Sequence, residues 1–276
     1  MTDSLMTTAP AVTRKTRRIS LPQFDTVSLV SLGVLMLFLA SWEWVLIPLL
    51  QISPALLPKP SAIALALWNG MTEGYLLSDT VITLTEVAAG YASGSIIGFL
   101  LAIPVAGSRT AERILSPYIV ALQAIPKVAI APLFVVWFGF GMTSKVIIVA
   151  LITFFPVFVN AVIGLRATPA EQHELFDVYG SSAWKRFLHL KVPNSLPYVF
   201  GGLNVGVTLS VIGAIVAEFV GAQEGIGAAI MRAGFALDTA GVFAAITLLT
   251  LIAAGASAGV QAIGRHLVFW MSSQKR

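Results

Sequence analysis

The sequence predicts an all-α polytopic membrane protein with six transmembrane helices, and three observations lead to this fold class. Hydrophobic residues make up 57% of the 276 residues and charged residues 11%, whereas a soluble protein carries about 25% charged residues. Six apolar runs approach or exceed the roughly 20 residues that a helix needs to cross a bilayer. The lysines and arginines stand in short segments beside these runs, which is typical of membrane topology signals.

Each apolar run is interpreted as the centre of one transmembrane helix. In chain order the runs are Val27–Leu50, Val87–Ser108, Leu115–Phe140, Val146–Leu165, Val192–Ala217 and Thr239–Gly264. Glu43 interrupts the first run and Lys127 the third, while the other four are uncharged. The first run is longer than the roughly 7–15 apolar residues of a signal peptide and lacks a small-residue cleavage site, so we expect it to stay in the chain.

Two segments between the runs are expected on the outer side. Prolines break the chain after the first run, and Ser61–Met71 then has the pattern of an amphipathic helix. Leu77–Glu86 is expected to lead directly into the second helix. After the fifth run, Gly221–Gly241 contains the apolar stretch Ala228–Ala236, which is too short to span a bilayer and suits a helix that dips into it.

The positive charges predict that both termini lie in the cytoplasm. Thirteen lysines and arginines then fall on the inner side, namely Arg14, Lys15, Arg17, Arg18, Arg109, Arg113, Arg166, Lys185, Arg186, Lys191, Arg265, Lys275 and Arg276. The outer side holds three, Lys59, Lys145 and Arg232, and the reverse topology would invert this asymmetry. We therefore expect a cytoplasmic tail at 1–26, a transmembrane domain at 27–266 and a second cytoplasmic tail at 267–276.

The cytoplasmic segment 166–197 carries the most informative polar pattern. Thr168 is expected to cap a helix with Pro169 at its first position, and Gly180 is expected to end that helix. The acidic residues on one face are Glu171, Glu174 and Asp177, and the apolar residues on another are Leu175, Phe176 and Tyr179. A second helix, Ser182–Leu190, is expected to stop at Pro193 and Pro197, before the fifth transmembrane helix.

Two interpretations of this segment are open. Its helices could lie on the inner leaflet, or they could bind a soluble protein partner. The first helix is acidic, and an anionic leaflet would repel it. A protein partner with basic and apolar groups in a groove is therefore the better fit.

Several functions are excluded or disfavoured by what the sequence lacks. No cysteine is present, which excludes disulfides, thiolate metal sites and cysteine nucleophiles. His173, His189 and His266 are scattered without metal-ligand spacing, so no metal site is expected. The basic residues flank membrane runs rather than forming a nucleic-acid surface. No glycine-rich phosphate loop followed by Lys and Ser or Thr occurs, so we expect no cofactor site and no ATP hydrolysis in this chain.

At this point the chain resembles a known family. The spacing Glu-x5-Gly-x9-(Leu/Ile)-x-(Leu/Val)-Pro, found here at Glu174, Gly180, Leu190, Val192 and Pro193, resembles the cytoplasmic coupling loop of binding-protein-dependent ABC importer permeases. The two alanines that usually follow the glutamate are Leu175 and Phe176 here. Two further stretches are similar to permeases for nitrate, sulfonate and taurine: Ala124–Leu133 with Trp137-Phe138-Gly139, and Ala217–Gly221 with Gly225-Ile226-Gly227.

The resemblance implies the ABC importer permease fold and a homodimer in a bacterial inner membrane. It also implies two cytoplasmic ATPase subunits that hydrolyse ATP with Mg²⁺, and an extracytoplasmic solute-binding protein. The residues that would contact the ATPase are Glu174, Leu175, Phe176, Asp177, Tyr179, Gly180 and Pro193. The solute would be a small anion such as nitrate, a sulfonate or taurine, or else a pyrimidine precursor, riboflavin or an aromatic acid. The stretch Ala236-Leu237-Asp238-Thr239 resembles the pyrimidine-precursor type.

Candidates for the translocation pathway are Pro126, Lys127, Pro132 and Glu218. The prolines remove backbone hydrogen bonds, which is tolerated where a helix packs on protein or lines a cavity. Lys127 could attract an anion, or it could pair with a helix carbonyl or reach water. Glu218 is expected to pair with backbone donors near Gly225 rather than with solute.

Two alternatives concern packing and function. Gly90, Gly94 and Gly98 repeat every four residues, and this small face could pack within one subunit or across a dimer. An ion-coupled secondary transporter and a membrane-embedded enzyme are the rival function classes. No internal repeat is visible, which disfavours the first, and few charged residues lie inside the runs, which disfavours the second.

Overall fold

The computed structural model describes residues 26–270, and this part of the chain is helical with no strand. The predicted all-α class is therefore confirmed. The first half contains α1 (Thr26–Ser41), η1 (Trp42–Leu46), α2 (Ile47–Leu50), α3 (Pro60–Thr72), α4 (Tyr75–Gly107), α5 (Arg109–Ala124) and α6 (Ala131–Phe138). The second half contains α7 (Met142–Arg166), α8 (Ala170–Val178), α9 (Ala183–Arg186), η2 (Phe187–Lys191), α10 (Val192–Phe219), α11 (Ile226–Phe235) and α12 (Thr239–Leu267).

Five helical segments of the described chain are long and apolar enough to cross a membrane. They are Leu29–Leu50, Tyr75–Gly107, Met142–Arg166, Ala183–Phe219 and Thr239–Leu267. Each of these segments matches one of the predicted runs. Helix α4 begins at Tyr75 and includes Leu77–Glu86, which confirms that this stretch leads directly into the second transmembrane helix. The polytopic architecture is confirmed, but the count of six is not.

The predicted third helix, Leu115–Phe140, is wrong as a single span. The structure divides it into α5 and α6, with a turn at Ile125–Ile130 between them. Ile125 adopts an extended conformation before Pro126, because proline disfavours a helical residue before it. With 16 residues α5 is about 24 Å long, which is less than the roughly 30 Å of a hydrocarbon core.

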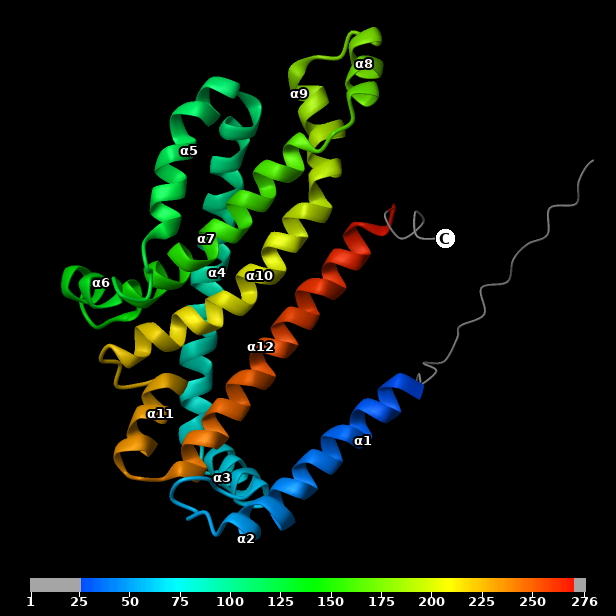
Figure 1. Ribbon diagram of the computed structural model, residues 1–276. Coiled ribbons are helices and arrows are strands. Elements are labelled where there is room, and N and C mark those ends of the chain that lie inside the picture. The colour runs from blue at the N-terminus through cyan, green and yellow to red at the C-terminus, as the bar shows by residue number, and fades with distance from the viewer. Residues whose placement is uncertain (1–25, 271–276) are drawn as a thin grey trace, which may run out of the picture.

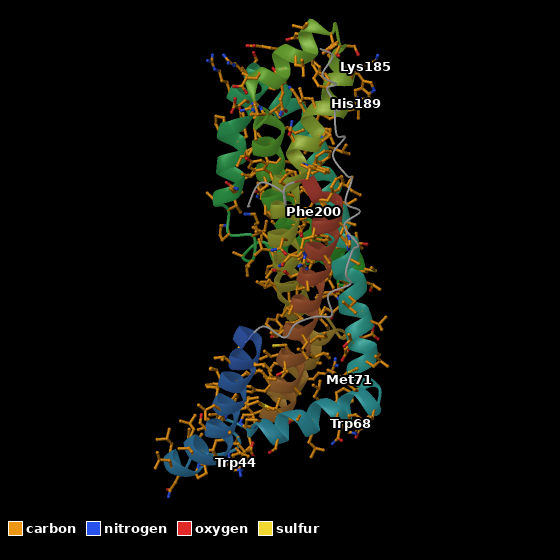
Figure 2. The ribbon with its side chains drawn as sticks, turned by 90° about the vertical axis from the view of Figure 1, so that its right-hand side faces the viewer. Trp44, Trp68, Met71, Lys185, His189 and Phe200 are labelled. Atoms are coloured by element: carbon orange, nitrogen blue, oxygen red, sulfur yellow. The ribbon has the colours of Figure 1, made fainter. Side chains whose placement is uncertain are left out.

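The long helices run side by side between two ends of the molecule (Figure 1). Helices α2 and α3 and the start of α12 lie at one end, and α8 and α9 lie at the opposite end. Helix α1 extends away from the others, and only 6% of the most apolar stretch of Leu29–Leu50, which comprises most of α1 together with η1 and α2, is buried. Figure 2 shows Trp44 and Trp68 toward the first end and Lys185 and His189 at the second, so the two ends differ in chemistry.

Glycines let α4, α7 and α10 approach backbone to backbone. A Cβ on Gly94 of α4 would stand 2.4 Å from the carbonyl oxygen of Ala150 in α7. On α10, a Cβ at Gly202 would stand 2.7 Å from the carbonyl oxygen of Pro156 in α7. The glycine face of α4 therefore packs within one subunit, which answers the alternative that the sequence left open.

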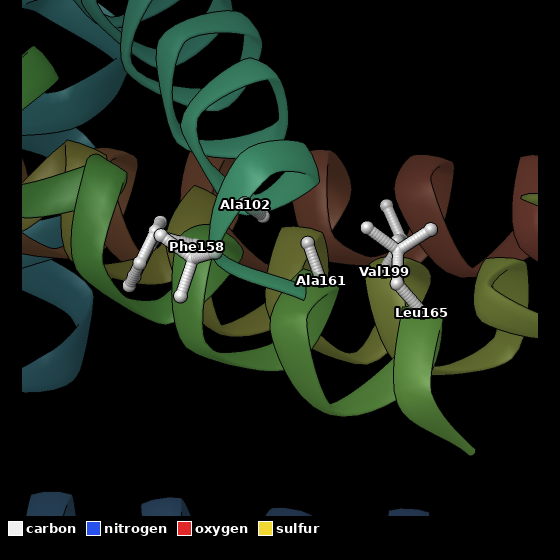
Figure 3. Close-up of a cluster of buried hydrophobic side chains, with 6 residues drawn as sticks. Ala102, Phe158, Ala161, Leu165 and Val199 are labelled. Atoms are coloured by element: carbon white, nitrogen blue, oxygen red, sulfur yellow. The ribbon is translucent and has the colours of Figure 1, made fainter. Parts of the chain in front are cut away.

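Apolar side chains fill the space where these three helices meet toward the α8 end. Ala102 and Val105 of α4 pack with Phe158, Ala161 and Leu165 of α7 and with Val199 of α10 in one buried cluster (Figure 3). Ala102 and Ala161 are fully buried, so the cluster tolerates no added volume there without displacement. The α4–α7–α10 unit is thus closely packed along most of its length.

The shorter elements follow the sequence with one correction. The predicted outer helix Ser61–Met71 is α3, and the predicted short helix after the fifth span is α11. However, Pro193 and Pro197 do not separate a second cytoplasmic helix from the fifth span, because α9, η2 and α10 follow one another without a break. The π-helical turn Phe187–Lys191 rearranges the hydrogen bonds just before Pro193, where proline lacks a donor.

Candidate functional site

Helix α8 (Ala170–Val178) lies at one end of the molecule (Figure 1), and several of its apolar side chains are exposed. Leu175, Val178 and Tyr179 are 53%, 84% and 78% exposed, and their spacing places them on one face. Glu174 is exposed on the same helix, whereas Phe176 is half-buried against the subunit itself. The sequence grouped Phe176 with Leu175 and Tyr179, but the structure puts Val178 in that exposed position instead.

Two side-chain contacts connect α8 to the helices that follow it. Asp177 forms an ion pair with Arg186 of α9. Gln172 accepts a hydrogen bond from Asn194 of α10 at 2.8 Å. These two contacts join α8 to α9 and to the start of α10.

The two ends of α8 differ in how well the sequence predicted them. At the start, the predicted cap is wrong, because Pro169 occupies the cap position and no side chain accepts a hydrogen bond there. At the other end, Gly180 has a φ of +63°, its amide donates to the Asp177 carbonyl at 2.9 Å, and the Ser181 amide donates to the Phe176 carbonyl at 3.0 Å. Glycine takes this left-handed conformation without the steric cost of a Cβ, so the predicted helix end is confirmed.

The residues predicted for the pathway are spread over three parts of the structure. Pro126 and Lys127 lie in the turn between α5 and α6, and Pro132 lies in the first turn of α6. The Lys127 ammonium donates to the Gln123 carbonyl at 3.1 Å and lies 4.5 Å from the centre of the Phe155 ring. Glu218 ends up elsewhere, at the end of α10, where it is 1% exposed.

Glu218 and two residues of α4 cap the start of α11. Glu218 accepts hydrogen bonds from the Gly227 amide and, at 2.6 Å, from the Thr83 hydroxyl. The Thr83 oxygen accepts the Ile226 amide at 2.8 Å, and Asp79 accepts the Gly225 amide at 2.7 Å. Three successive backbone donors that a helix leaves unpaired are thereby satisfied from two other helices. The expected pairing of Glu218 with backbone donors near Gly225 is confirmed.

Two ion pairs of α4 lie beside this network, one to α7 and one to α11, and the sequence reasoning missed both. Lys145 in the first turn of α7 donates to Glu86 of α4 at 2.6 Å, with side-chain exposures of 9% and 2%. Arg232 of α11 pairs with Asp79 of α4. The sequence analysis assigned Lys145 and Arg232 to the outer side and named no partner for either. The spacing of four and three residues between Asp79, Thr83 and Glu86 was a signal of one polar helix face.

A hollow of about 680 Å³ opens beside the Lys145–Glu86 pair. It lies between the first third of α4, the start of α7 and the segment that follows α10. The residues that line it are Ile82, Thr85, Glu86, Phe140, Gly141, Met142, Lys145, Gly221, Gln223 and Glu224. Ligand sites commonly have volumes of about 300–1,000 Å³. The hollow is therefore large enough for a small molecule.

Comparison with known proteins places the chain in a transport family. Residues 94–272 match the family described as the binding-protein-dependent transport system inner membrane component. A riboflavin transport system permease protein of Chloroflexus aurantiacus is 36% identical over 95% of this chain and 98% of its own length. A formylaminopyrimidine transport permease protein of Halalkalibacterium halodurans is 37% identical over 80% of this chain and 88% of its own.

A taurine transport system permease protein of Escherichia coli is 29% identical over 87% of this chain and 89% of its own length. These relatives are named as transport components, and each covers at least 80% of this chain. The described residues contain five helical segments long and apolar enough to cross a membrane, so the fold is that of a multi-pass membrane protein. The chain belongs to the binding-protein-dependent transport system inner membrane components and is a permease of an ABC importer.

Proposed function

We propose that this permease imports an uncharged nitrogen heterocycle, such as a pyrimidine precursor or a flavin, and takes its energy from separate ATPase subunits. Two copies of the chain form the membrane unit, two cytoplasmic ATPases bind ATP and Mg²⁺, and an extracytoplasmic binding protein delivers the solute. Both termini are cytoplasmic in this arrangement. The family supports the proposed partners, and the asymmetric distribution of lysines and arginines supports the proposed orientation.

The observation that carries the proposal is the exposed stripe of α8. Leu175, Val178 and Tyr179 form an apolar surface on a helix that also carries the exposed Glu174. Such a surface at the basic end of a membrane protein suits a groove in a soluble partner rather than lipid. Its contacts with α9 and α10, and the fixed end at Gly180, would transmit movement of that partner to the fifth span.

The choice of solute rests on two supports. The relatives named for riboflavin and formylaminopyrimidine are 36% and 37% identical to the chain, whereas those named for taurine and nitrate are 29% and 27% identical. Lys127, the candidate for attracting an anion, already donates to a carbonyl and faces an aromatic ring. Its charge is partly compensated within the subunit, so an anion is not needed to balance it.

Uptake by the reconstituted importer tests both parts. In proteoliposomes with the ATPases and the binding protein, we expect ATP-dependent uptake of formylaminopyrimidine or riboflavin. Gly180→Val should abolish uptake and weaken co-purification of the ATPase, because valine is strained at a φ of +63°. Ser181→Val, one residue further along, is the matched control and should retain both.

Normal uptake and normal ATPase association in Gly180→Val would rule out α8 as the coupling element. Uptake that continues without ATP and follows an ion gradient would support the ion-coupled alternative. Lys127→Met distinguishes the solutes: a neutral heterocycle should enter at an unchanged rate, whereas an anion that depends on this ammonium should be slowed strongly. Uptake of taurine or nitrate in place of the heterocycles would contradict the proposed solute class.

A further inference from the structure

We propose that Glu86 and Glu218 form a proton-binding site: the two acids share one proton, which joins the end of α10 to α4 and holds the start of α11. The proton is a bound ligand with a structural role, and that role is the same whichever solute the permease imports. The site therefore goes beyond the proposed function and does not depend on it.

Glu86 and Glu218 meet inside the subunit, away from water. The Glu86 side chain is 2% exposed and Glu218 is 1% exposed. Glu86 Oε1 accepts the Lys145 ammonium at 2.6 Å, whereas Oε2 is buried and receives no hydrogen bond from a donor group of the described residues. The two carboxyl groups nevertheless lie within hydrogen-bonding reach of each other. Ionised carboxylates only accept, so this contact becomes a hydrogen bond when one proton lies between the two acids.

The charges around the two acids also call for one proton. Ionisable groups of α4, α7, α10 and α11 meet here, namely Asp79, Glu86, Lys145, Glu218 and Arg232. Lys145 pairs with Glu86 and Arg232 pairs with Asp79, so among the described residues Glu218 has no cation within ion-pair distance. Fully ionised, the group would carry one net negative charge in a buried place, which is costly. One shared proton makes the group neutral.

The remaining neighbours of Glu218 offset only part of a charge. Its carboxyl accepts the Thr83 hydroxyl at 2.6 Å and the Gly227 amide in the first turn of α11. A helix start is equivalent to about half a positive charge, and this one also faces Asp79 through the Gly225 amide. Glu224, exposed beside the hollow, would add negative charge. Two carboxyl groups placed this closely favour the state in which they hold one proton between them.

Loss of the proton would have to displace α11. When the O–H bond breaks and the proton passes to water or hydroxide in the neighbouring hollow, both acids are left as carboxylates that repel each other. Glu218 cannot turn aside alone, because the start of α11 encloses it. A Cβ built on Gly227 would stand 2.7 Å from Glu218 Oε2, and a Cβ on Gly225 would stand closer still to its carboxyl. The contact is therefore present at low pH and is lost, together with the position of α11, as the pH rises.

Infrared spectroscopy of the full-length permease in lipid nanodiscs tests for the shared proton, because a protonated carboxyl has a C=O stretching band that a carboxylate lacks. We expect a change from neutral to alkaline pH to remove one such band from the native chain. Glu86→Gln and Glu218→Gln should each abolish this pH-dependent band, because the remaining acid then faces an amide donor and has Lys145 as its counter-charge. Glu73→Gln, at the exposed residue that ends α3, is the matched control and should retain the band.

Hydrogen exchange of the same preparations tests whether the proton holds α11. After correction for the intrinsic effect of pH on exchange, we expect the amides in the first turn of α11 to exchange faster at alkaline pH in the native chain. The rise should be about tenfold per pH unit beyond the point at which the single proton is lost. Glu86→Gln should show no such rise, because its amide can accept from Lys145 and donate to Glu218 as a protonated Glu86 would.

Two kinds of result would overturn the site. Loss of the infrared band in only one of the two glutamine variants would assign the proton to a single acid, and a band retained in both would assign it elsewhere. No rise in exchange in the native chain, or an equal rise in Glu86→Gln, would show that the proton does not hold α11. Neither measurement involves uptake, the ATPases or a solute, so failure of the proposed function would leave both results unchanged.

Discussion

Replacing Gly94 with alanine should break the contact between α4 and α7. The added Cβ would stand 2.4 Å from the Ala150 carbonyl oxygen and 2.9 Å from the Ala150 Cα. Both are backbone atoms in the middle of a helix, so no side-chain rotation can make room. Overpacking typically costs about 1–3 kcal/mol, and a clash with rigid backbone belongs at the upper end of that range.

A loss of about 3 kcal/mol would change the unfolding equilibrium by roughly a hundredfold. Gly259→Ala on α12 is the matched control, because nothing lies within 4 Å of a Cβ built there. That change should stabilise slightly, by about 0.5–1 kcal/mol, since alanine favours the helix over glycine. Unfolding of the purified protein in mixed detergent micelles, followed by circular dichroism, measures both variants.

The reasoning would be refuted if Gly94→Ala were as stable as Gly259→Ala. Loss of dimer without loss of subunit stability would also refute it, because the glycine face would then pack across the dimer. Gly98→Ala provides a graded comparison. Its Cβ would stand 2.9 Å from the Phe154 carbonyl oxygen, a milder clash than the 2.4 Å at Gly94, so we expect a smaller loss of unfolding free energy.

Three further predictions concern other elements. Thr83→Val leaves the Ile226 amide without its acceptor, which should cost about 1–3 kcal/mol and speed hydrogen exchange at that amide. The Arg166 guanidinium holds the pKa of Glu112 below its usual range, so this contact stabilises the fold above the unfolded pKa and is lost as pH falls through the folded one. Glu112→Gln should therefore lower the thermal stability slightly at neutral pH and leave it unchanged at acid pH, so that the variant's stability depends less on pH than that of the native chain. Ser182→Cys should not react with an impermeant thiol reagent added outside intact cells, and labelling there would contradict the topology.

The long helices could be predicted because their signal is continuous. Thr239–Leu267 and Met142–Arg166 are apolar over more than a span, and the sequence located both to within a few residues. The division of Leu115–Phe140 into α5 and α6 could not be predicted from hydropathy, because a run of apolar residues has the same mean hydropathy whether or not its helix is interrupted. Pro126 and Pro132 were visible in the sequence, but the extended residue before Pro126 depends on local sterics that an average over a window does not record.

The candidate site was predictable only where it is local. Gly180 ends α8 through backbone geometry within five residues, and the sequence pattern identified it. The pairs Glu86–Lys145 and Asp79–Arg232 join residues 59 and 153 positions apart, and no local pattern states which helices meet. Lys145 contributed to the topology prediction as a charge on the outer side, and nothing in its local sequence indicated that its partner would be the buried Glu86.

The same contacts limit how this permease can move during the proposed transport cycle. Asn194 of α10 donates a hydrogen bond to Gln172 of α8, and Arg166 at the end of α7 donates to the Val105 carbonyl of α4 at 2.7 Å. Glycine contacts then lock α7 to α4 and α10 along their length, since close-packed backbone cannot slide without clashes. Movement that begins at α8 should therefore carry α4, α7 and α10 as one body, together with the hollow at their far end.

Alternating access then has to come from displacement of this body against its neighbours, among which α1 and α12 expose the largest share of their surfaces. If so, a change that loosens the α4–α7 contact, such as Gly94→Ala, should reduce uptake more than it reduces ATP hydrolysis, because the subunit would absorb the movement internally instead of passing it to the hollow.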